Sequence, residues 1–299
     1  MKKVLSVLLS ALLVLSLWGC GKEAPAQIAA TTLPVYAFTQ SLCQGTPLTV
    51  TRLVTEEVSC LHDYSLDVRQ VKAAEAAEVI VISGAGLEEF LEGILEEEKL
   101  IDASRGIELL EPEYGHGHGE EHGHDHGHDH GHDHGTDPHI WLSPENAAIM
   151  ARNICRELSG RYPEYRQTFE ENTADLLLEL QALQEYGDRS LGELRCRELI
   201  TFHDGFGYLA QAFDLHILEA IEEESGSEAS ARELIRMIEE VEHHGLPAVF
   251  TEVNGSPSAA EVIARETGAK VFPLDMAMSG DDYFTSMYYN IDTLKEALG

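Results

Sequence analysis

From residue 27 onward, short apolar runs alternate with longer stretches in which apolar positions recur at helical spacing. The clearest helical stretch places Leu87, Phe90, Leu91, Ile94 and Leu95 at i, i+3, i+4, i+7 and i+8. The apolar runs predict strands, which in chain order are Gln27–Thr31, Leu48–Leu53, Glu78–Ile82, Ile107–Leu110, Glu198–Phe202, His216–Leu218, Ala248–Glu252 and Lys270–Leu274. Strands separated by helices predict parallel sheets built from right-handed βαβ units.

A long helical stretch lies midway between two similar halves of the chain. Pro163 can open a helix, and the pattern then continues without glycine or proline to Tyr186 and stops at Gly187. One more surface helix of a single domain is the alternative to a helix that joins two lobes. We predict an α/β protein with two lobes, each a parallel β-sheet flanked by helices, joined by a long rigid α-helix. The expected segments are 20–162 for the N-terminal lobe, 163–190 for the linking helix and 191–299 for the C-terminal lobe.

The first residues have the pattern of an export signal. Lys2 and Lys3 precede an apolar stretch too short to be a permanent membrane span, and the stretch ends in Leu17-Trp18-Gly19-Cys20. This ending resembles the lipobox of bacterial lipoproteins, in which the cysteine is acylated. We therefore expect residues 1–19 to be a lipoprotein signal peptide and Cys20 to carry a lipid anchor, with ordinary secretion and a free Cys20 as the alternative.

The chain is strongly acidic, with 20 Lys and Arg against 53 Asp and Glu and a net charge of −33. Such a balance argues against nucleic acid and against anionic lipid surfaces as ligands. It raises the local concentration of cations without selecting among them.

Four cysteines follow Cys20, and none forms a C-x-x-C pair, so a thiolate zinc site is not expected. Export permits disulfides. The pairing of Cys43 with Cys60 and of Cys155 with Cys196 closes the shortest loops, and four free buried thiols are the alternative.

Nine histidines alternate with glycine and acidic residues in one segment, which we assign to a His-rich loop at 115–136. They are His116, His118, His122, His124, His126, His128, His130, His132 and His134. Neutral imidazole is a favoured ligand of borderline metals such as zinc, and this composition is too polar and flexible to build a core. The segment therefore predicts loose metal binding in water. A chance low-complexity insertion and a purification tag are the alternatives, and the internal position argues against a tag.

Four further residues stand where predicted strands end and loops begin, and two of them come from each half. They are His62, His139, His203 and Asp275. In open α/β sheets ligands bind beyond the carboxyl ends of the strands. Three imidazoles and one carboxylate form a tetrahedral set suited to zinc. Each residue alone has a simpler interpretation as a solvated or capping side chain.

The chain resembles the metal-binding substrate-binding lipoproteins of bacterial ABC transporters, which carry zinc or manganese. The matching segments are Asp137-Pro138-His139-Ile140-Trp141-Leu142-Ser143-Pro144, Thr201–Leu209, Val249–Glu252, Ile263–Val271, Leu274-Asp275 and Tyr289–Leu294. The resemblance covers nearly the whole mature chain in order. It implies that the same four residues ligate the metal, and that the His-rich loop belongs to a zinc-type member.

One matching segment departs from the family. Its first ligand usually lies in a Pro-His-x-Tyr-Glu-Pro motif, whereas this chain has Leu61-His62-Asp63-Tyr64-Ser65-Leu66. His62 is therefore the least secure ligand. Manganese-type members commonly have Glu at the position of His203. Because Mn²⁺ prefers oxygen, the histidine favours zinc.

Several other polar residues have two interpretations. Asp204 and Glu252 are either partners that orient a ligating imidazole or caps and surface acids. His243 and His244 precede Gly245 at a predicted helix end, where structural, exposed histidines are expected. His216 lies in a predicted strand and is not expected to bind metal.

The leading hypothesis is a lipid-anchored zinc receptor, expected to be a monomer, on the cell surface or the periplasmic side of the cytoplasmic membrane. It would capture Zn²⁺ between two lobes and deliver it to an ABC permease and its ATPase. A manganese receptor of the same family, a zinc-dependent hydrolase and a simple metal sink are the alternatives. The hydrolase is disfavoured because four protein ligands leave no open position for water, and no H-E-x-x-H motif occurs.

Overall fold

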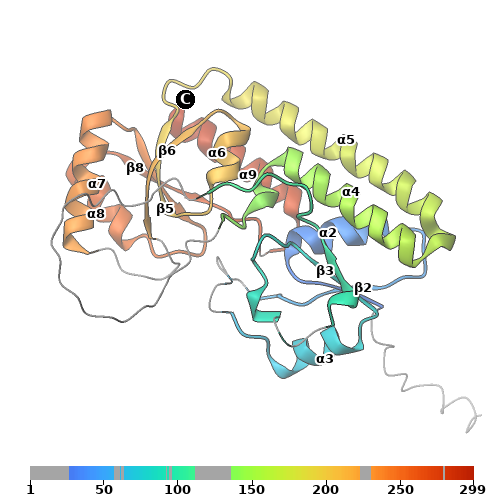
Figure 1. Cartoon of the computed structure of the whole chain (residues 1–299). Helices are drawn as coiled ribbons and strands as arrows, with labels where there is room; N and C mark the ends of the chain where they lie inside the picture. Colours follow the sequence, from blue (N-terminus) through green and yellow to red (C-terminus); the bar gives the residue numbers. More distant parts are fainter. Residues whose placement is uncertain are drawn as a thin grey trace, which may run out of the picture.

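The computed structural model describes residues 27–56, 61, 64–91, 93, 96–111, 136–222, 230–278 and 280–299. These residues form two four-stranded sheets, and every neighbouring pair of strands is parallel (Figure 1). The N-terminal sheet has the order β2 (Val50–Arg52), β1 (Ile28–Ala30), β3 (Val79–Ile82) and β4 (Leu100–Asp102). The C-terminal sheet has the order β6 (His216–Glu222), β5 (Glu198–His203), β7 (Ala248–Glu252) and β8 (Lys270–Leu274). The predicted two-lobe α/β fold is confirmed.

Both sheets follow the same strand order, in which the second strand lies on one side of the first and the third strand lies on the other. In such sheets a crevice opens at the carboxyl ends of the first and third strands, because the connections leave in opposite directions there. The crevice of the N-terminal sheet lies at β1 and β3, and that of the C-terminal sheet at β5 and β7. We call these two places the switch points.

Helices cover both sheets (Figure 1). In chain order the α-helices are α2 (Leu33–Leu42), α3 (Val68–Ala76), α4 (Pro144–Arg161), α5 (Arg166–Leu191), α6 (Gly207–Ala212), α7 (Ala231–His244), α8 (Ser258–Thr267) and α9 (Tyr283–Leu298). Short 3₁₀ turns occupy η2 (Glu89–Leu91), η3 (Glu97–Lys99), η4 (Ile140–Leu142) and η5 (Pro163–Tyr165). Ser143 caps α4 by accepting a hydrogen bond from the Asn146 N–H, and Pro144 starts the helix.

The long central helix is α5, which packs against α4, α9 and α2 (Figure 1). The predicted stop at Gly187 is wrong, because the helix continues to Leu191. Gly187 is buried within the helix, and a Cβ placed there would lie 2.1 Å from the Phe213 ring. The glycine therefore permits close packing between α5 and the segment before β6, and tertiary packing offsets its poor helix propensity.

One apolar core runs through both halves of the molecule. It joins residues of β1 and α2 to residues of α4, α5, β7 and α9. A second cluster packs α7 and α8 against β5 and β7, and a third packs α3 against β1 and β3. Each sheet thus has one face on the shared core and the other face on helices of its own half.

Two predictions for the chain around β4 are wrong: the strand at Ile107–Leu110 and the helix that begins near Leu87. Strand β4 is Leu100–Asp102, which pairs with β3, whereas Ile107–Leu110 forms no strand. The Leu110 N–H instead donates to the Tyr208 hydroxyl across the two halves at 2.9 Å. The helical pattern from Leu87 yields only the 3₁₀ turn at Glu89–Leu91 in its described part.

Cys43, Cys155 and Cys196 are free thiols, so the considered pairing of Cys155 with Cys196 is wrong. Cys60 and Cys20 lie outside the described residues, as do the signal segment and the His-rich loop histidines. Over the described ranges, no helix has the length and apolar character needed to cross a membrane.

Candidate metal centre

His139 lies just before η4, in the segment that leads into α4. The Asp137 carboxylate Oδ1 accepts a hydrogen bond from the His139 backbone N–H at 2.9 Å and lies 2.8 Å from Nδ1. Because a carboxylate only accepts, Nδ1 is the donor in this contact, and the neutral tautomer that it favours has its lone pair on Nε2. The ring is 1% exposed, and Nε2 has no hydrogen-bond partner among the described residues. A buried imidazole held in this way is prepared to bind a cation.

His203 is the last residue of β5 and lies at the switch point of the C-terminal sheet. Its ring is 2% exposed, and Nδ1 lies 3.5 Å from Oε1 of Glu252, the last residue of the neighbouring strand β7. This distance is longer than a hydrogen bond and short enough for an electrostatic contact. A carboxylate thus lies near Nδ1 of each buried histidine.

Gly205 makes room for the His203 ring. A Cβ at this position would lie 2.7 Å from His203 Cδ2, 2.9 Å from His203 Nε2 and 2.7 Å from the Met276 methyl group. Any other residue at 205 would therefore displace the ring or the methionine.

The two histidines meet across the two halves of the molecule. Their ring centroids are 5.2 Å apart, and the rings are nearly perpendicular at 85°. Trp141 packs edge-on against His139, with ring centroids 5.5 Å apart. The structure therefore brings together two of the four residues that the sequence singles out.

Asp275 directly follows β8, the strand beside β7, and its position is fixed by α9. Ser286 donates to Asp275 Oδ2 at 2.7 Å, and the Ala277 N–H donates to Oδ1 at 2.8 Å. Asn290 bonds both the N–H and the carbonyl of Asp275 at 2.7 Å. Carboxylate oxygens with one accepted bond each keep lone pairs for a further contact.

The segment after Asp275 is tied to the histidine side of the site. The Trp141 Nε1–H donates to the Met276 carbonyl at 2.7 Å, and the Tyr283 hydroxyl donates to the Trp141 carbonyl at 2.8 Å. The described residues nevertheless include no group of three His, Cys, Asp or Glu side chains placed to hold a metal ion. His62 lies outside the described residues, so the full four-ligand set stays a prediction, with Asp275 as one of its members.

The remaining histidines of the described chain lie elsewhere. His216 is exposed at the start of β6, and His243 and His244 end α7 before Gly245. His244 contacts Glu198 at 3.0 Å on the surface. Asp137 is an orienting residue that the sequence analysis does not identify, and its one sequence signal is its position two residues before His139. Asp204 stays a prediction.

Comparison with known proteins relates this arrangement to metal uptake. The family model described as ZnuA, zinc-uptake complex component A periplasmic, matches residues 28–297. The chain is 31% identical to the zinc-binding lipoprotein AdcA of Streptococcus pneumoniae serotype 4, over 99% of this chain and 61% of that protein. The chain thus spans about three fifths of the length of that curated relative.

Two solved structures are similar over most of the chain. A crystal structure of ZnuA superimposes with a TM-score of 0.76 at 30% identity, covering 92% of this chain and 100% of that one. The crystal structure of Zn(II)-bound AdcA from Streptococcus pneumoniae has a TM-score of 0.73 at 27% identity, covering 91% of this chain and 57% of that one.

Proposed function

Because the chain belongs to the ZnuA family of zinc-uptake complex components, we propose that it is an extracytoplasmic Zn²⁺ receptor that delivers the ion to an ABC importer. The observation that carries this proposal is the pair of buried imidazoles of His139 and His203, which face each other from the two halves. Each imidazole has a carboxylate near Nδ1, from Asp137 and Glu252 respectively. This is the arrangement that orients histidines toward a metal and raises their basicity.

We assign the ligands as His62, His139, His203 and Asp275. His139 and His203 supply two imidazole nitrogens at the boundary of the two halves. Asp275 supports the assignment by its place at the carboxyl edge of the C-terminal sheet and by the hydrogen bonds that fix its carboxylate. With one more imidazole the set reaches the four ligands that tetrahedral zinc takes.

Zinc is the cargo that this donor set favours. Two imidazoles in one site suit Zn²⁺, whereas Mn²⁺ prefers an oxygen-rich set. Relatives named for zinc binding support the same choice. We expect Zn²⁺ to displace Mn²⁺ completely at equal concentrations, because divalent affinity at such sites rises from Mn²⁺ towards Zn²⁺.

The four protein ligands that we assign also favour a binding role over catalysis. A catalytic zinc keeps an open position for water, and four protein ligands leave none. The partners are then a membrane permease with its ATPase, and a lipid on Cys20 would keep the receptor, as a monomer, beside them. The His-rich loop at 115–136 would gather zinc loosely and pass it to the tight site.

The direct test is zinc titration against a competing chelator, in variants of the chain. His139→Ala and His203→Ala should each weaken the tight site by more than about 100-fold, beyond the 10–100-fold typical of losing an orienting partner. The matched control is His216→Ala, an exposed histidine that should leave affinity unchanged. Unchanged tight binding in both ligand variants would refute the assignment.

Deletion of 115–136 separates the tight site from the loop. The shortened chain should keep one tight equivalent of zinc and lose the weak ones. If the deletion removed all binding, the protein would be a metal sink.

A further inference from the structure

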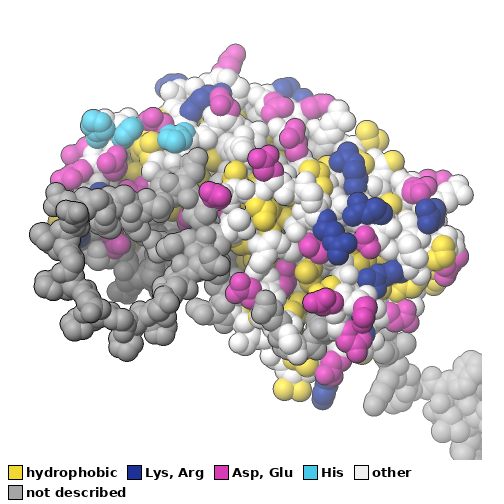
Figure 2. Space-filling model, in the orientation of Figure 1, with side chains coloured by type: hydrophobic (Ala, Val, Ile, Leu, Met, Phe, Trp, Pro, Cys, Tyr) yellow, Lys and Arg dark blue, Asp and Glu magenta, His cyan; other side chains and the backbone are white. Residues whose placement is uncertain are grey.

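Arginine side chains gather on one face of this acidic protein. Figure 2 shows Lys and Arg side chains concentrated over α4 and the elements beside it. We define the arginine face as Arg105, Arg152, Arg156 and Arg166, all of them exposed. Asn153 joins Arg105 to α4 by donating to the Arg105 carbonyl at 2.8 Å.

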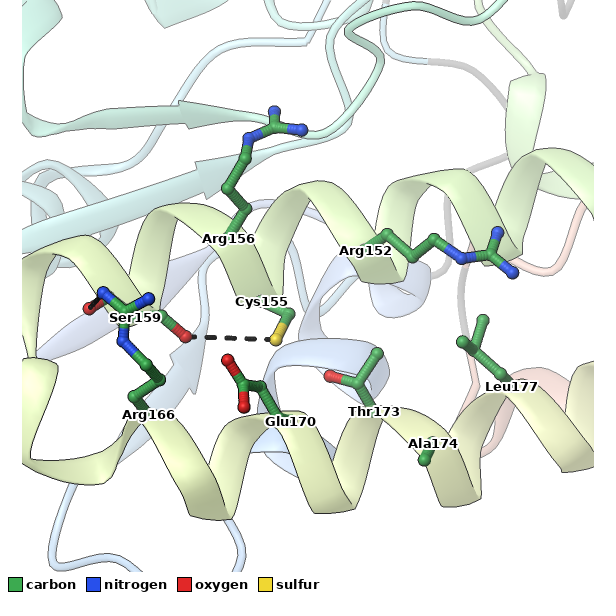
Figure 3. A pocket seen from close by; sticks show the side chains of 9 residues that line it. All are labelled: Arg152, Cys155, Arg156, Ser159, Arg166, Glu170, Thr173, Ala174 and Leu177. Carbon is green, nitrogen blue, oxygen red and sulfur yellow. Dashed lines mark hydrogen bonds between the residues drawn. The ribbon is translucent and has the colours of Figure 1, made fainter.

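A groove of about 360 Å³ runs between α4 and α5 within this face (Figure 3). Three members of the arginine face line it together with one carboxylate, Glu170, and its other walls are formed by Cys155, Ser159, Thr173, Ala174 and Leu177. The lining thus combines three guanidinium groups and one carboxylate with apolar and weakly polar side chains. Such a groove matches a ligand that has an anionic group attached to an apolar body.

Most N–H donors of the guanidinium groups on this face have no hydrogen-bond partner within the described part of the chain. Arg152 makes no hydrogen bond or ion pair within the described part of the chain, and Arg166 makes one bond, to the Ser159 carbonyl at 3.3 Å. Arg105 and Arg156 approach the same Glu157 carboxylate, at 3.8 and 3.5 Å. Since a guanidinium has five N–H donors, the face can still bind phosphate oxygens.

The arginine face lies close to the point where the described chain begins. Tyr162, the residue after α4, donates to the Glu78 carboxylate at 3.1 Å, and the Glu78 N–H donates to the Gln27 carbonyl at 2.9 Å. Only six residues lie between Cys20 and Gln27. The seven steps from one Cα atom to the next span at most about 25 Å in an extended chain. Arg152 lies about 14 Å along the helix from its end, at 1.5 Å per residue. A lipid on Cys20 would therefore hold the arginine face within reach of the membrane.

We propose that the arginine face binds the phosphate groups of anionic lipids in the membrane that carries the anchor, and so orients the receptor on that membrane. The proposal rests on the lipid anchor, which is part of the proposed function, and is independent of the zinc site. The metal centre would keep one fixed direction relative to the importer.

The net charge of −33 does not oppose this contact. At physiological ionic strength the Debye length is about 8 Å, so carboxylates on distant surfaces are screened from the lipid. Close to the bilayer, each arginine is expected to contribute about fivefold to the preference for an anionic surface. Within the face, Glu157 and Glu170 offset part of the positive charge, so the contact depends on the guanidinium donors that these two carboxylates leave free.

Arginine footprinting of the lipidated protein tests the contact. The zinc-free protein is reconstituted in vesicles of phosphatidylcholine alone or with phosphatidylglycerol, modified with phenylglyoxal and analysed by peptide mass spectrometry. Anionic vesicles should slow modification of the four residues of the arginine face, Arg105, Arg152, Arg156 and Arg166, by at least about fivefold. Arg232 and Arg265, exposed on α7 and α8, are internal controls whose rates should not change. Flotation of the protein with neutral vesicles checks the anchor separately.

Variants that remove charges test whether the protection from phenylglyoxal depends on the positive charge of the arginine face. In Arg152→Gln/Arg156→Gln/Arg166→Gln the remaining Arg105 should lose its protection, whereas the matched triple Arg232→Gln/Arg236→Gln/Arg265→Gln should keep it. Glu170→Gln, which removes the carboxylate lining the groove, should increase protection. Zinc affinity should be the same in all of these proteins, so a failure here is distinct from a failure of the receptor function.

Two results would overturn the proposal. Equal modification rates in neutral and anionic vesicles would show that the face does not contact lipid. Equal protection by inorganic phosphate with neutral vesicles would assign the groove to a free anion instead.

Discussion

The switch points of the two sheets have the same topology and different contents. At the C-terminal one, β5 ends in His203 and β7 ends in Glu252, and the imidazole faces the other half. At the N-terminal one, Thr31 after β1 donates to the buried Glu88 after β3 at 2.7 Å. The Ser83 and Gly84 N–H groups bond the same carboxylate. One switch point directs an imidazole towards the other half of the molecule, whereas the other has a carboxylate that accepts three hydrogen bonds from its own half.

The comparison accounts for the place of His139, the described one of the two histidines that we assign to the site from the N-terminal half. With its own crevice closed by hydrogen bonds, that half contributes His139 from the chain leading into α4. Asp137, two residues earlier, orients this ring at 2.8 Å, whereas Glu252 approaches His203 at 3.5 Å from a neighbouring strand. The carboxylate near His139 thus comes from the local sequence, whereas the carboxylate near His203 comes from a neighbouring strand.

Among the variants that test this comparison, those that neutralise the carboxylates near the two imidazoles should change zinc affinity the most. Asp137→Asn should weaken zinc binding about 10–100-fold, because the amide no longer favours the Nδ1–H tautomer with a full charge. Glu252→Gln should weaken binding by about tenfold or less, because its contact is longer. Chelator competition measures both affinities. A larger loss in Glu252→Gln than in Asp137→Asn would contradict the ranking.

Gly205→Ala should disturb only the metal ligand that we assign to the C-terminal half next to this glycine, His203. The added Cβ would collide with the His203 ring and the Met276 methyl group, so we expect a loss of affinity of about tenfold together with about 1–3 kcal/mol of stability. Gly160→Ala near the end of α4 is the matched control, since its Cβ meets open space. Zinc titration and urea unfolding report the two effects. Wild-type affinity in Gly205→Ala would show that ring placement does not depend on this glycine.

The smallest effect concerns the closed N-terminal switch point. Burial raises the pKa of Glu88 to about 7 from its ordinary 4.5, although three hydrogen bonds to the carboxylate act in the opposite direction. The folded state therefore binds more protons than the unfolded state between about pH 4.5 and pH 7. This contribution to stability is present below that range and is lost as the pH rises through it.

Glu88→Gln should remove this pH dependence, on the order of 2 kcal/mol, from urea unfolding measured at pH 5 and pH 8. The exposed neighbour variant Glu89→Gln should keep the wild-type dependence. An unchanged slope in Glu88→Gln would mean that the carboxylate stays ionised throughout.

Apolar patterning predicted most of the fold. Strands Ala248–Glu252 and Lys270–Leu274 have the predicted bounds. The first is buried along its whole length, as a largely apolar run predicts for a central parallel strand, whereas the second is a partly exposed edge strand. Leu100–Asp102 was missed because three residues beside a charged turn carry little periodic signal. The extent of α5 was misjudged because its continuation past Gly187 depends on a tertiary neighbour, Phe213, which local sequence does not reveal.

The site was predictable to the extent that motifs mark it. The positions of His139 and His203 near strand ends, together with the family resemblance, predicted that the two residues share one site. The structure brings their rings together. The proximity of Glu252 to His203 depends on the pairing of β5 with β7, a long-range feature that left its role open. The fixing of Asp275 by Ser286 and Asn290 likewise requires α9 to fold back on β8.

X-ray absorption at the zinc edge is the most direct test of the central claim, using the chain without 115–136 and one equivalent of Zn²⁺. The spectrum should show four nitrogen and oxygen ligands, including at least two imidazoles, and no sulfur. His139→Ala should lose one imidazole contribution. Zinc bound with fewer than two imidazoles, or an identical spectrum in the variant, would contradict a site shared between the two halves.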